Sequence, residues 1–139
     1  MKRYMLDASA FMLLIKKADE ENTVKCLGES VILDLTFFEV GNAVWKEGTL
    51  TKLVSEEAAK IMQAAAQTIL QRMESVGYDP GSFEEIVEIA KEERITFYDS
   101  SYIHAAKLRG LQLVTEDKAL RAKAEKYVKT QNTTGLLPL

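Results

Sequence analysis

Four acidic residues far apart in the sequence are the side chains best placed for chemistry: Asp7, Glu39, Asp99 and Asp117. Each stands at or near the point where a short apolar run, typical of a buried strand, gives way to a helical pattern. In an open parallel sheet, the loops at the carboxyl ends of the strands converge around one crevice. We therefore expect these four carboxylates to meet at one edge of a sheet.

Clustered carboxylates repel one another, and this repulsion falls when a cation binds between them. Oxygen ligands without histidine or cysteine favour magnesium or manganese over zinc. Two such ions about 4 Å apart could generate hydroxide from water, hold a phosphodiester in line for attack and stabilise the leaving oxygen, and one ion could supply part of this. The acids therefore predict a Mg²⁺ or Mn²⁺ site suited to phosphodiester hydrolysis.

A purely structural interpretation of the same acids is that they cap helices. Aspartate is a favoured N-cap residue, and Thr36 with Glu39 matches the capping-box spacing, so each acid alone could simply satisfy backbone N–H groups. Serine, threonine and asparagine would cap equally well, yet an acid stands at every predicted strand-to-helix junction. This regularity favours a functional role for the set.

The remaining chain must supply the strands and helices that bring these acids together. Strands are predicted at residues 3–6, 31–35, 95–98 and 111–115, with a possible last strand at 127–130. Helices are predicted from residue 7 or 9 to about 17, and then at 21–27, 37–47, 55–76, 82–93, 100–109 and 118–126. The alternation predicts an α/β fold, a three-layer α/β/α sandwich around a mostly parallel sheet of four or five strands.

Local signals indicate where several of these helices begin and end. Glycine follows four of them and predicts their carboxyl ends, at Gly28, Gly48, Gly77 and Gly110. Ser82 and Glu85 have the spacing of a capping box, which predicts a helix start at residue 82. The apolar tail, residues 135–139, could pack on its own chain, on a second subunit or on a partner protein.

The size and composition are those of one globular domain covering residues 1–139. Apolar residues make up 47% of the chain, which is ample material for a core. The net charge of −3 argues against a protein that binds nucleic acid through a generally basic surface. It does not exclude a nuclease, because bound divalent cations would offset the acids of the site.

Cysteine usage and hydropathy predict a cytoplasmic protein with no membrane segment. Cys26 is the only cysteine, so no internal disulfide can form, and a buried thiol suits a reducing compartment. The apolar run at residues 10–15 is preceded by Asp7 and closed by Lys16 and Lys17. Nothing in the chain approaches the roughly 18 consecutive apolar residues that suggest a membrane span.

Four segments around the acids carry a resemblance to a known family: residues 4–9, 37–46, 97–106 and 113–120. Any one of them is a weak signal, but their order, spacing and strand-to-helix context together are specific. The chain resembles the PIN-domain family and, within it, the VapC-like toxins of prokaryotic toxin–antitoxin pairs. The resemblance implies a single-domain ribonuclease with magnesium or manganese at the acids. It also implies a homodimer and inhibition by a small antitoxin protein.

The resemblance assigns roles to further residues. The four acids match the acidic quartet of the family, and Ser9 and Thr115 match hydroxyl positions that orient those carboxylates or their waters. Asn42 lies one helical turn past Glu39, and Lys46 lies two turns past it, so the three share a face. Asn42 is expected to position Glu39 or a substrate phosphate. Lys46 could contact a phosphate or remain a solvated surface lysine.

Two other residues near these segments are interpreted as structural. Glu116 is expected to be an exposed glutamate in the first turn of a helix. His104, the only histidine, lies five residues past Asp99 and so about 140° round the helix from it. His104 is therefore expected to face away from the acids.

The leading hypothesis is a metal-dependent endoribonuclease, the toxin of a toxin–antitoxin pair, that hydrolyses RNA with metal-activated water. A second hypothesis is a PIN-type module that binds RNA or protein without cutting. A third is a signalling receiver domain that binds magnesium. A receiver requires an adjacent acidic pair after the first strand and a phosphoacceptor in mid-chain, whereas here Asp7 stands alone and two of the acids lie in the last third.

Overall fold

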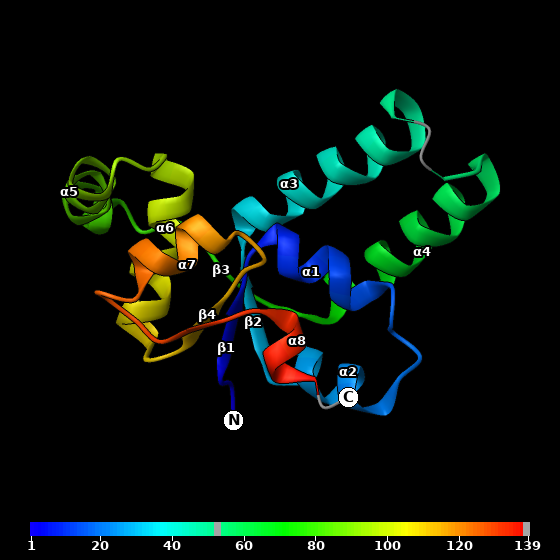
Figure 1. Ribbon diagram of the computed structural model, residues 1–139, viewed down its shortest axis with the longest axis horizontal. Helices are drawn as coiled ribbons and strands as arrows, with labels where there is room; N and C mark the ends of the chain where they lie inside the picture. Colours follow the sequence, from blue (N-terminus) through cyan, green and yellow to red (C-terminus); the bar gives the residue numbers. More distant parts are fainter. Residues whose placement is uncertain (52–53, 138–139) are drawn as a thin grey trace.

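The computed structural model describes residues 1–51 and 54–137. Its centre is one sheet of five parallel strands in the order β3-β2-β1-β4-β5 (Figure 1). The strands are β1 (Tyr4–Leu6), β2 (Ser30–Leu33), β3 (Glu74–Val76), β4 (Gln112–Val114) and β5 (Thr130–Gln131). The predicted parallel sheet is confirmed, and β1 and β4, from opposite ends of the chain, are neighbours at its centre.

Helices cover both faces of the sheet, which confirms the three-layer sandwich. They are α1 (Ala8–Ile15), α2 (Glu21–Gly28), α3 (Asp34–Trp45), α4 (Glu56–Arg72), α5 (Phe83–Glu93), α6 (Phe97–Arg109), α7 (Lys118–Ala124) and α8 (Thr133–Leu136). Successive strand residues point to opposite faces. Met5 and Leu113 pack with α5, α6 and α7, whereas Leu6 and Val114 pack with α1 and α2. All of β1 is buried, as expected for a strand covered on both faces.

Helices α3 and α4 extend beyond the sheet as a pair that runs in opposite directions (Figure 1). The base of this pair is fixed to α1, because Phe11 packs with Val40 of α3 and Ala66 of α4. The predicted helix end at Gly48 is wrong. Instead, α3 continues into a π-helical turn, Lys46–Leu50, that contains Gly48.

The predicted helix at 55–76 combines two elements. Helix α4 ends at Arg72, and Glu74–Val76 forms the edge strand β3, so the helix end predicted at Gly77 is also wrong. Met73 and Val76 continue the apolar spacing of α4, and this pattern does not mark the change from helix to strand. The short strand becomes recognisable only when β2 is available to pair with it.

The strand predicted at 95–98 is wrong. Thr96 is the N-cap of α6, and its Oγ1 accepts a hydrogen bond from the backbone N–H of Asp99 at 3.0 Å. The β-branched and aromatic residues of this segment favour a strand locally, but Thr96 caps a helix that begins at Phe97, three residues before the predicted start at residue 100. Asp99 therefore lies in the first turn of a helix and does not follow a strand.

Smaller differences concern element ends. Helix α3 begins at Asp34, so Leu35 is helical, and the last strand lies at Thr130–Gln131 instead of 127–130. The predicted capping box at Ser82 is absent, because Ser82 closes a 3₁₀ turn and its hydroxyl donates to Asp79 at 3.3 Å. The stop of α6 at Gly110, with φ 67°, is confirmed.

The apolar tail packs on its own chain. Leu136 and Leu137 contact the core cluster that contains Leu14 and Ile32. Residues 138 and 139, the rest of the predicted tail, lie outside the described residues. Among the described helices, none is both long enough and apolar enough to cross a membrane.

Candidate active site

Asp7 is held rigidly at the carboxyl end of β1. It is the N-cap of α1, where Oδ1 accepts from the backbone N–H of Ala10 at 3.0 Å and from the Ser9 hydroxyl at 2.6 Å. The register of β1 with β4 pairs Leu6 with Val114, so Asp7 lies beside Thr115. The Ser9 and Thr115 hydroxyl oxygens are 3.3 Å apart. Both predicted hydroxyl residues thus lie at Asp7, and the residue itself is only 8% exposed.

Asp117 occupies the matching place after β4. It is the N-cap of α7, and its Oδ1 accepts from the backbone N–H of Leu120 at 3.0 Å. Its own N–H donates to Thr115 Oγ1 at 3.1 Å, while the N–H of Glu116 donates to Ser9 Oγ at 3.0 Å. The two hydroxyls therefore link the loop after β1 to the loop after β4. Both aspartates cap helices, as the structural interpretation requires.

Capping does not account for Glu39 and Asp99. Thr36, not Glu39, completes the first turn of α3, because its Oγ1 accepts from the Leu33 backbone N–H at 3.1 Å. The predicted capping role of Glu39 is wrong, and its Oε1 instead accepts a hydrogen bond of 2.6 Å from the Tyr102 hydroxyl. Asp99 accepts no capping bond, since Thr96 caps α6.

Tyr102 is a site residue that the sequence analysis missed. Its side chain is buried, and its hydroxyl also lies 2.7 Å from Thr36 Oγ1. Because the phenolic proton goes to Glu39, the threonine hydroxyl must donate to Tyr102. Burial and the hydrogen bond to Glu39 both raise the pKa of the phenol, so Tyr102 stays a neutral donor. Its position three residues after Asp99, on the same helix face, is the signal that could have identified it.

The acids affect one another electrostatically. Burial raises the pKa of Asp7, and the charge of Asp117 raises it further, against the lowering effect of its hydrogen bonds. Burial also raises the pKa of Glu39, with contributions from Asp7 and Asp99, although the Tyr102 hydrogen bond opposes the shift. The pKa of Asp99 is raised by burial and by the charges of Asp117 and Asp7. The four carboxylates are therefore near enough for their charges to act on one another.

The other residues near the quartet differ in how they fit. Asn42 and Lys46 are exposed, and the structure gives neither side chain a hydrogen bond to an acid. Glu116 is not an exposed first-turn residue, because it precedes the cap and its Oε1 accepts from the backbone and side chain of Thr133 at 2.8 and 2.6 Å. Glu116 thus ties α8 to the loop after β4. His104 is buried and its Nε2 lies 2.8 Å from Glu85, in keeping with a structural role.

The quartet fits a hard divalent cation in donor chemistry but is not closed around one. Within residues 1–51 and 54–137, no three acidic, histidine or cysteine side chains lie close enough together to hold a metal ion by themselves. Magnesium commonly binds one or two carboxylates and keeps waters and substrate phosphates as its other ligands. An open edge of mutually repelling carboxylates suits that mode, because a cation relieves both the repulsion and the cost of burial.

The sequence matches the PIN domain over residues 4–126, and the chain belongs to the PIN-domain family. Among curated proteins, it is similar to exonuclease VapC9 of Pyrobaculum aerophilum, with 38% identity over 125 residues that cover 88% of this chain and 86% of the relative.

Solved structures share the fold. The crystal structure of PAE2754 from Pyrobaculum aerophilum has a TM-score of 0.80 and 32% identity, covering 97% of this chain and 93% of that one. The structure of FitAB bound to an IR36 DNA fragment has a TM-score of 0.63 and 17% identity, with 93% and 94% covered, which shows a common fold.

Proposed function

We propose that this protein is a metal-dependent ribonuclease, the toxin of a toxin–antitoxin pair, whose active site is the quartet Asp7, Glu39, Asp99 and Asp117. The observation that carries the proposal is the electrostatic coupling of these acids at one edge of the sheet, with the pKa values of three of them raised. Membership of the PIN family and similarity to a protein named as a VapC nuclease support it.

The chain's own residues would bind and orient the cation and the substrate. Asp7, fixed by Ser9 and the Ala10 N–H, presents a carboxylate in one orientation, and Tyr102 does the same for Glu39. Magnesium or manganese held there would act as a Lewis acid toward the phosphodiester. Asn42 and Lys46, exposed one and two turns beyond Glu39, are proposed to contact the RNA strand, and Lys46 would do so as a point charge.

The test is cleavage of RNA with magnesium or manganese by the wild type, Asp7→Asn and Asp99→Asn. We expect each variant to lose at least about a hundredfold in kcat/KM, because a ligand of the cation is lost. Asp19→Asn, an exposed aspartate outside the site, is the matched control and should retain activity. Full activity of both site variants, or activity in excess chelator, would contradict the mechanism. RNA binding without any metal-dependent product would favour the alternative of a non-cleaving module.

Circular RNA decides how the strand is attacked. We propose cleavage within the strand, whereas the curated relative is named an exonuclease. A circle has no end, so only an endonuclease can open it. Metal-dependent linear products from a circle would support internal cleavage, and cleavage of the linear form alone would indicate attack from an end.

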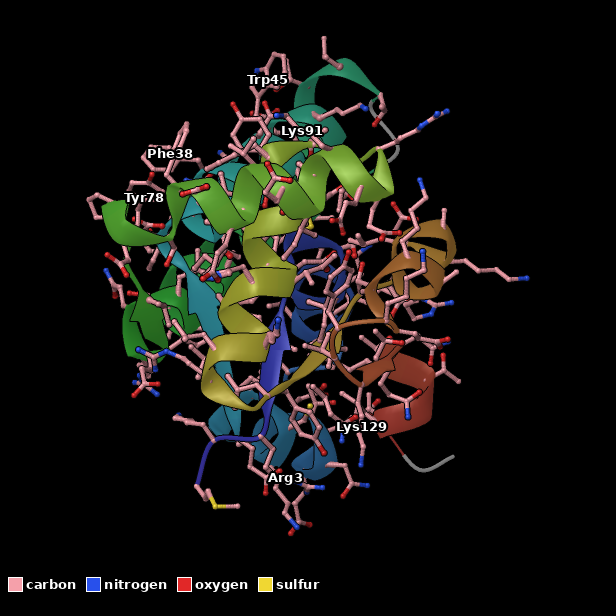
Figure 2. The ribbon with its side chains drawn as sticks, turned by 90° about the vertical axis from the view of Figure 1, so that its left-hand side faces the viewer. Arg3, Phe38, Trp45, Tyr78, Lys91 and Lys129 are labelled. Atoms are coloured by element: carbon pink, nitrogen blue, oxygen red, sulfur yellow. The ribbon has the colours of Figure 1, made fainter. Side chains whose placement is uncertain are left out.

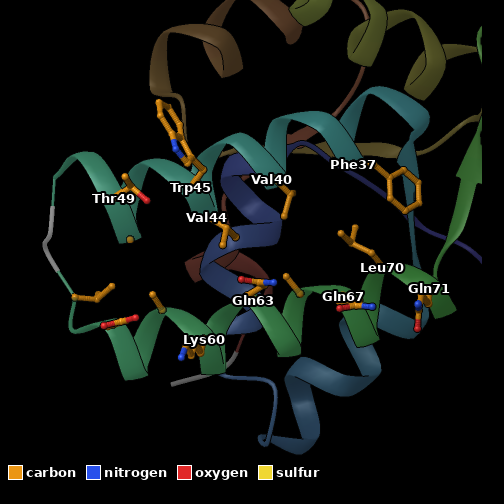
Figure 3. A pocket seen from close by; sticks show the side chains of 16 residues that line it. Phe37, Val40, Val44, Trp45, Thr49, Lys60, Gln63, Gln67, Leu70 and Gln71 are labelled. Carbon is orange, nitrogen blue, oxygen red and sulfur yellow. The ribbon is translucent and has the colours of Figure 1, made fainter.

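A groove between α3 and α4 is the surface we propose for the antitoxin. Its volume is about 940 Å³, and Figure 3 shows Val40 and Val44 of α3 facing Gln63 and Leu70 of α4 across it. The apolar floor suits one face of an amphipathic helix, a common mode of peptide recognition. Loss of inhibition by the cognate antitoxin in Val44→Asp, with ribonuclease activity retained, would support this assignment. Unchanged inhibition would contradict it.

A homodimer is proposed from a second surface, beside α6. Phe38 is 78% exposed and Leu108 is 70% exposed, and both line a hollow of about 290 Å³ together with Tyr78 and Tyr98. Phe38 and Tyr78 lie close together on one side of the molecule (Figure 2). Contiguous exposed apolar surface of this kind marks interfaces. Sedimentation of the Leu108→Asp variant as a monomer would support this interface, provided that the control Ile61→Asp sediments as the wild type does. We place the protein in the cytoplasm.

A further inference from the structure

At the end of the sheet opposite the acids, a hollow of about 410 Å³ is lined by basic side chains. Strands β1 and β4 begin there, and α6 ends there. Its described lining contains Lys2, Arg3, Lys107 and Lys129 and no acidic residue. Figure 2 shows Arg3 and Lys129 together at this end of the molecule. In a chain of net charge −3, this is a local concentration of positive charge.

Only part of that charge is neutralised within the protein. Arg3 pairs with Glu29 at 3.4 Å. Lys2 Nζ donates to a backbone carbonyl at 2.8 Å, which orients the ammonium but leaves its charge. Within the part of the chain that the structure describes, the ion pairs do not include Lys107 or Lys129. The hollow therefore retains an excess of at least three positive charges.

Helix stability accounts for two of these cations at most. Lys107 is in the last turn of α6, where a cation interacts favourably with the helix dipole. Lys2 donates to the carbonyl of Gly28, the last residue of α2, and so stabilises the end of that helix. Arg3 and Lys129 belong to neither helix. Like charges gathered in a hollow repel one another, and a bound anion relieves this repulsion.

We propose that this basic hollow is a second contact site for the RNA substrate, which binds strand phosphates several nucleotides away from the cleaved bond. The proposal rests on the ribonuclease function proposed above. Along β1, Arg3 and Asp7 are four residues apart, about 13 Å. Along α6, Asp99 and Lys107 are eight residues apart, about 12 Å. At about 3.4 Å per nucleotide of a stacked strand, this straight-line separation corresponds to roughly four nucleotides, so a strand that passes over the surface needs at least that many.

The first test is binding of a short single-stranded RNA in the presence of chelator, so that cleavage does not interfere. Each lost phosphate contact should reduce the slope of log K against log salt by about 0.7, so Lys107→Ala/Lys129→Ala should lower it by about 1.4. At about 0.1 M salt, this corresponds to binding about 25-fold weaker. Lys107→Arg/Lys129→Arg keeps both charges and should bind as the wild type does.

The matched control is Lys25→Ala/Lys91→Ala. Both lysines are exposed, as Lys107 and Lys129 are, and they lie outside the hollow in the last turns of α2 and α5, as Lys107 lies in the last turn of α6. The control removes the same net charge and should leave the salt slope unchanged. Equal loss of affinity in the two double alanine variants would overturn the proposal, because RNA would then respond only to overall charge.

Cleavage kinetics give the second test. A trinucleotide is too short to reach from the acids to the hollow, whereas a longer RNA reaches both. The Lys107→Ala/Lys129→Ala variant should therefore show a raised KM for the longer RNA, with kcat unchanged and with normal kinetics on the trinucleotide. Equal effects on both lengths would overturn the proposal. If the wild type cuts no RNA, the ribonuclease function is overturned. The RNA site is still supported if the double alanine variant binds RNA more weakly than the double arginine variant does.

Discussion

The hydroxyl of Tyr102 lies between two residues of α3, Thr36 at 2.7 Å and Glu39 at 2.6 Å. Through this pair of hydrogen bonds, α6 fixes one acid of α3 and carries another, Asp99, one turn earlier. The site is thus organised by neutral hydroxyls as well as by the acids they orient. The hydroxyls of Ser9 and Thr115 link the loops after β1 and β4, as the Tyr102 hydroxyl links α3 and α6.

Replacing Tyr102 with phenylalanine tests its positioning role. A hydrogen bond to a charged group contributes about 1.5–3 kcal/mol, so we expect kcat/KM to fall about 10- to 100-fold. The Tyr102 hydrogen bond lowers the pKa of Glu39, so its loss should raise that pKa further. The acidic limb of the pH–rate profile should then move to higher pH. Tyr98→Phe, on the same helix, is the control, and an unshifted limb in Tyr102→Phe would indicate a merely structural role.

Elements that position the site end at identifiable residues, and Gly110 is the clearest. It adopts φ 67° at the end of α6, directly before the segment that enters β4. A Cβ added at Gly110 would meet nothing within 4 Å, so any cost of Gly110→Ala comes from the backbone alone. We expect this change to lower the free energy of unfolding by about 1 kcal/mol.

Gly28→Ala is the matched control for that substitution. It also has open space around an added Cβ, but it lies within α2 without a positive φ. Alanine there should be neutral or stabilise by about 0.5–1 kcal/mol. Urea unfolding of both variants measures the difference, and equal effects at the two positions would exclude the backbone explanation.

The sequence could predict those parts of the fold that local residue signals determine. Helix α6 stops where Gly110 indicates, and the central strands follow from their apolar runs. The edge strand Glu74–Val76 could not be predicted, because its residues are mostly exposed and its identity depends on pairing with β2. The strand predicted at 95–98 failed because a threonine cap outweighed strand propensity.

The candidate site divides in the same way. Asp7, Ser9, Thr115 and Asp117 follow two central strands directly, so their neighbourhood was predictable from order along the chain. The hydrogen bond from Tyr102 to Glu39 joins residues 63 positions apart, and no local pattern encodes it. Glu116 was misjudged for a related reason, since its partner Thr133 lies in a helix that had not been predicted.

At the scale of the whole molecule, the quartet makes stability depend on pH, and the proposed metal site would make it depend on metal as well. The pKa values of Asp7, Glu39 and Asp99 are raised in the folded protein. In the unfolded chain these groups titrate near about pH 4. Between that pH and their folded-state pKa values, the native protein therefore binds more protons than the unfolded chain does. Stability must therefore fall as pH rises through that window. Glu93, whose pKa is lowered by Lys126 and Tyr127, acts oppositely, and its contribution is lost only as pH falls below about 4.

The Asp99→Asn variant separates the effect of charge repulsion on stability from the effect of metal binding. Without metal at neutral pH, the variant should unfold at a higher temperature than the wild type, because it lacks one of the mutually repelling charges, on a half-buried side chain. With magnesium or manganese, the order should reverse, since ligand binding stabilises the native state by about 2.7 kcal/mol at a hundredfold excess over Kd, and the variant binds more weakly. Thermal unfolding across pH, with and without metal, measures both effects. A variant less stable than the wild type in chelator would show that the Asp99 charge stabilises the fold, contrary to the electrostatic account of the site.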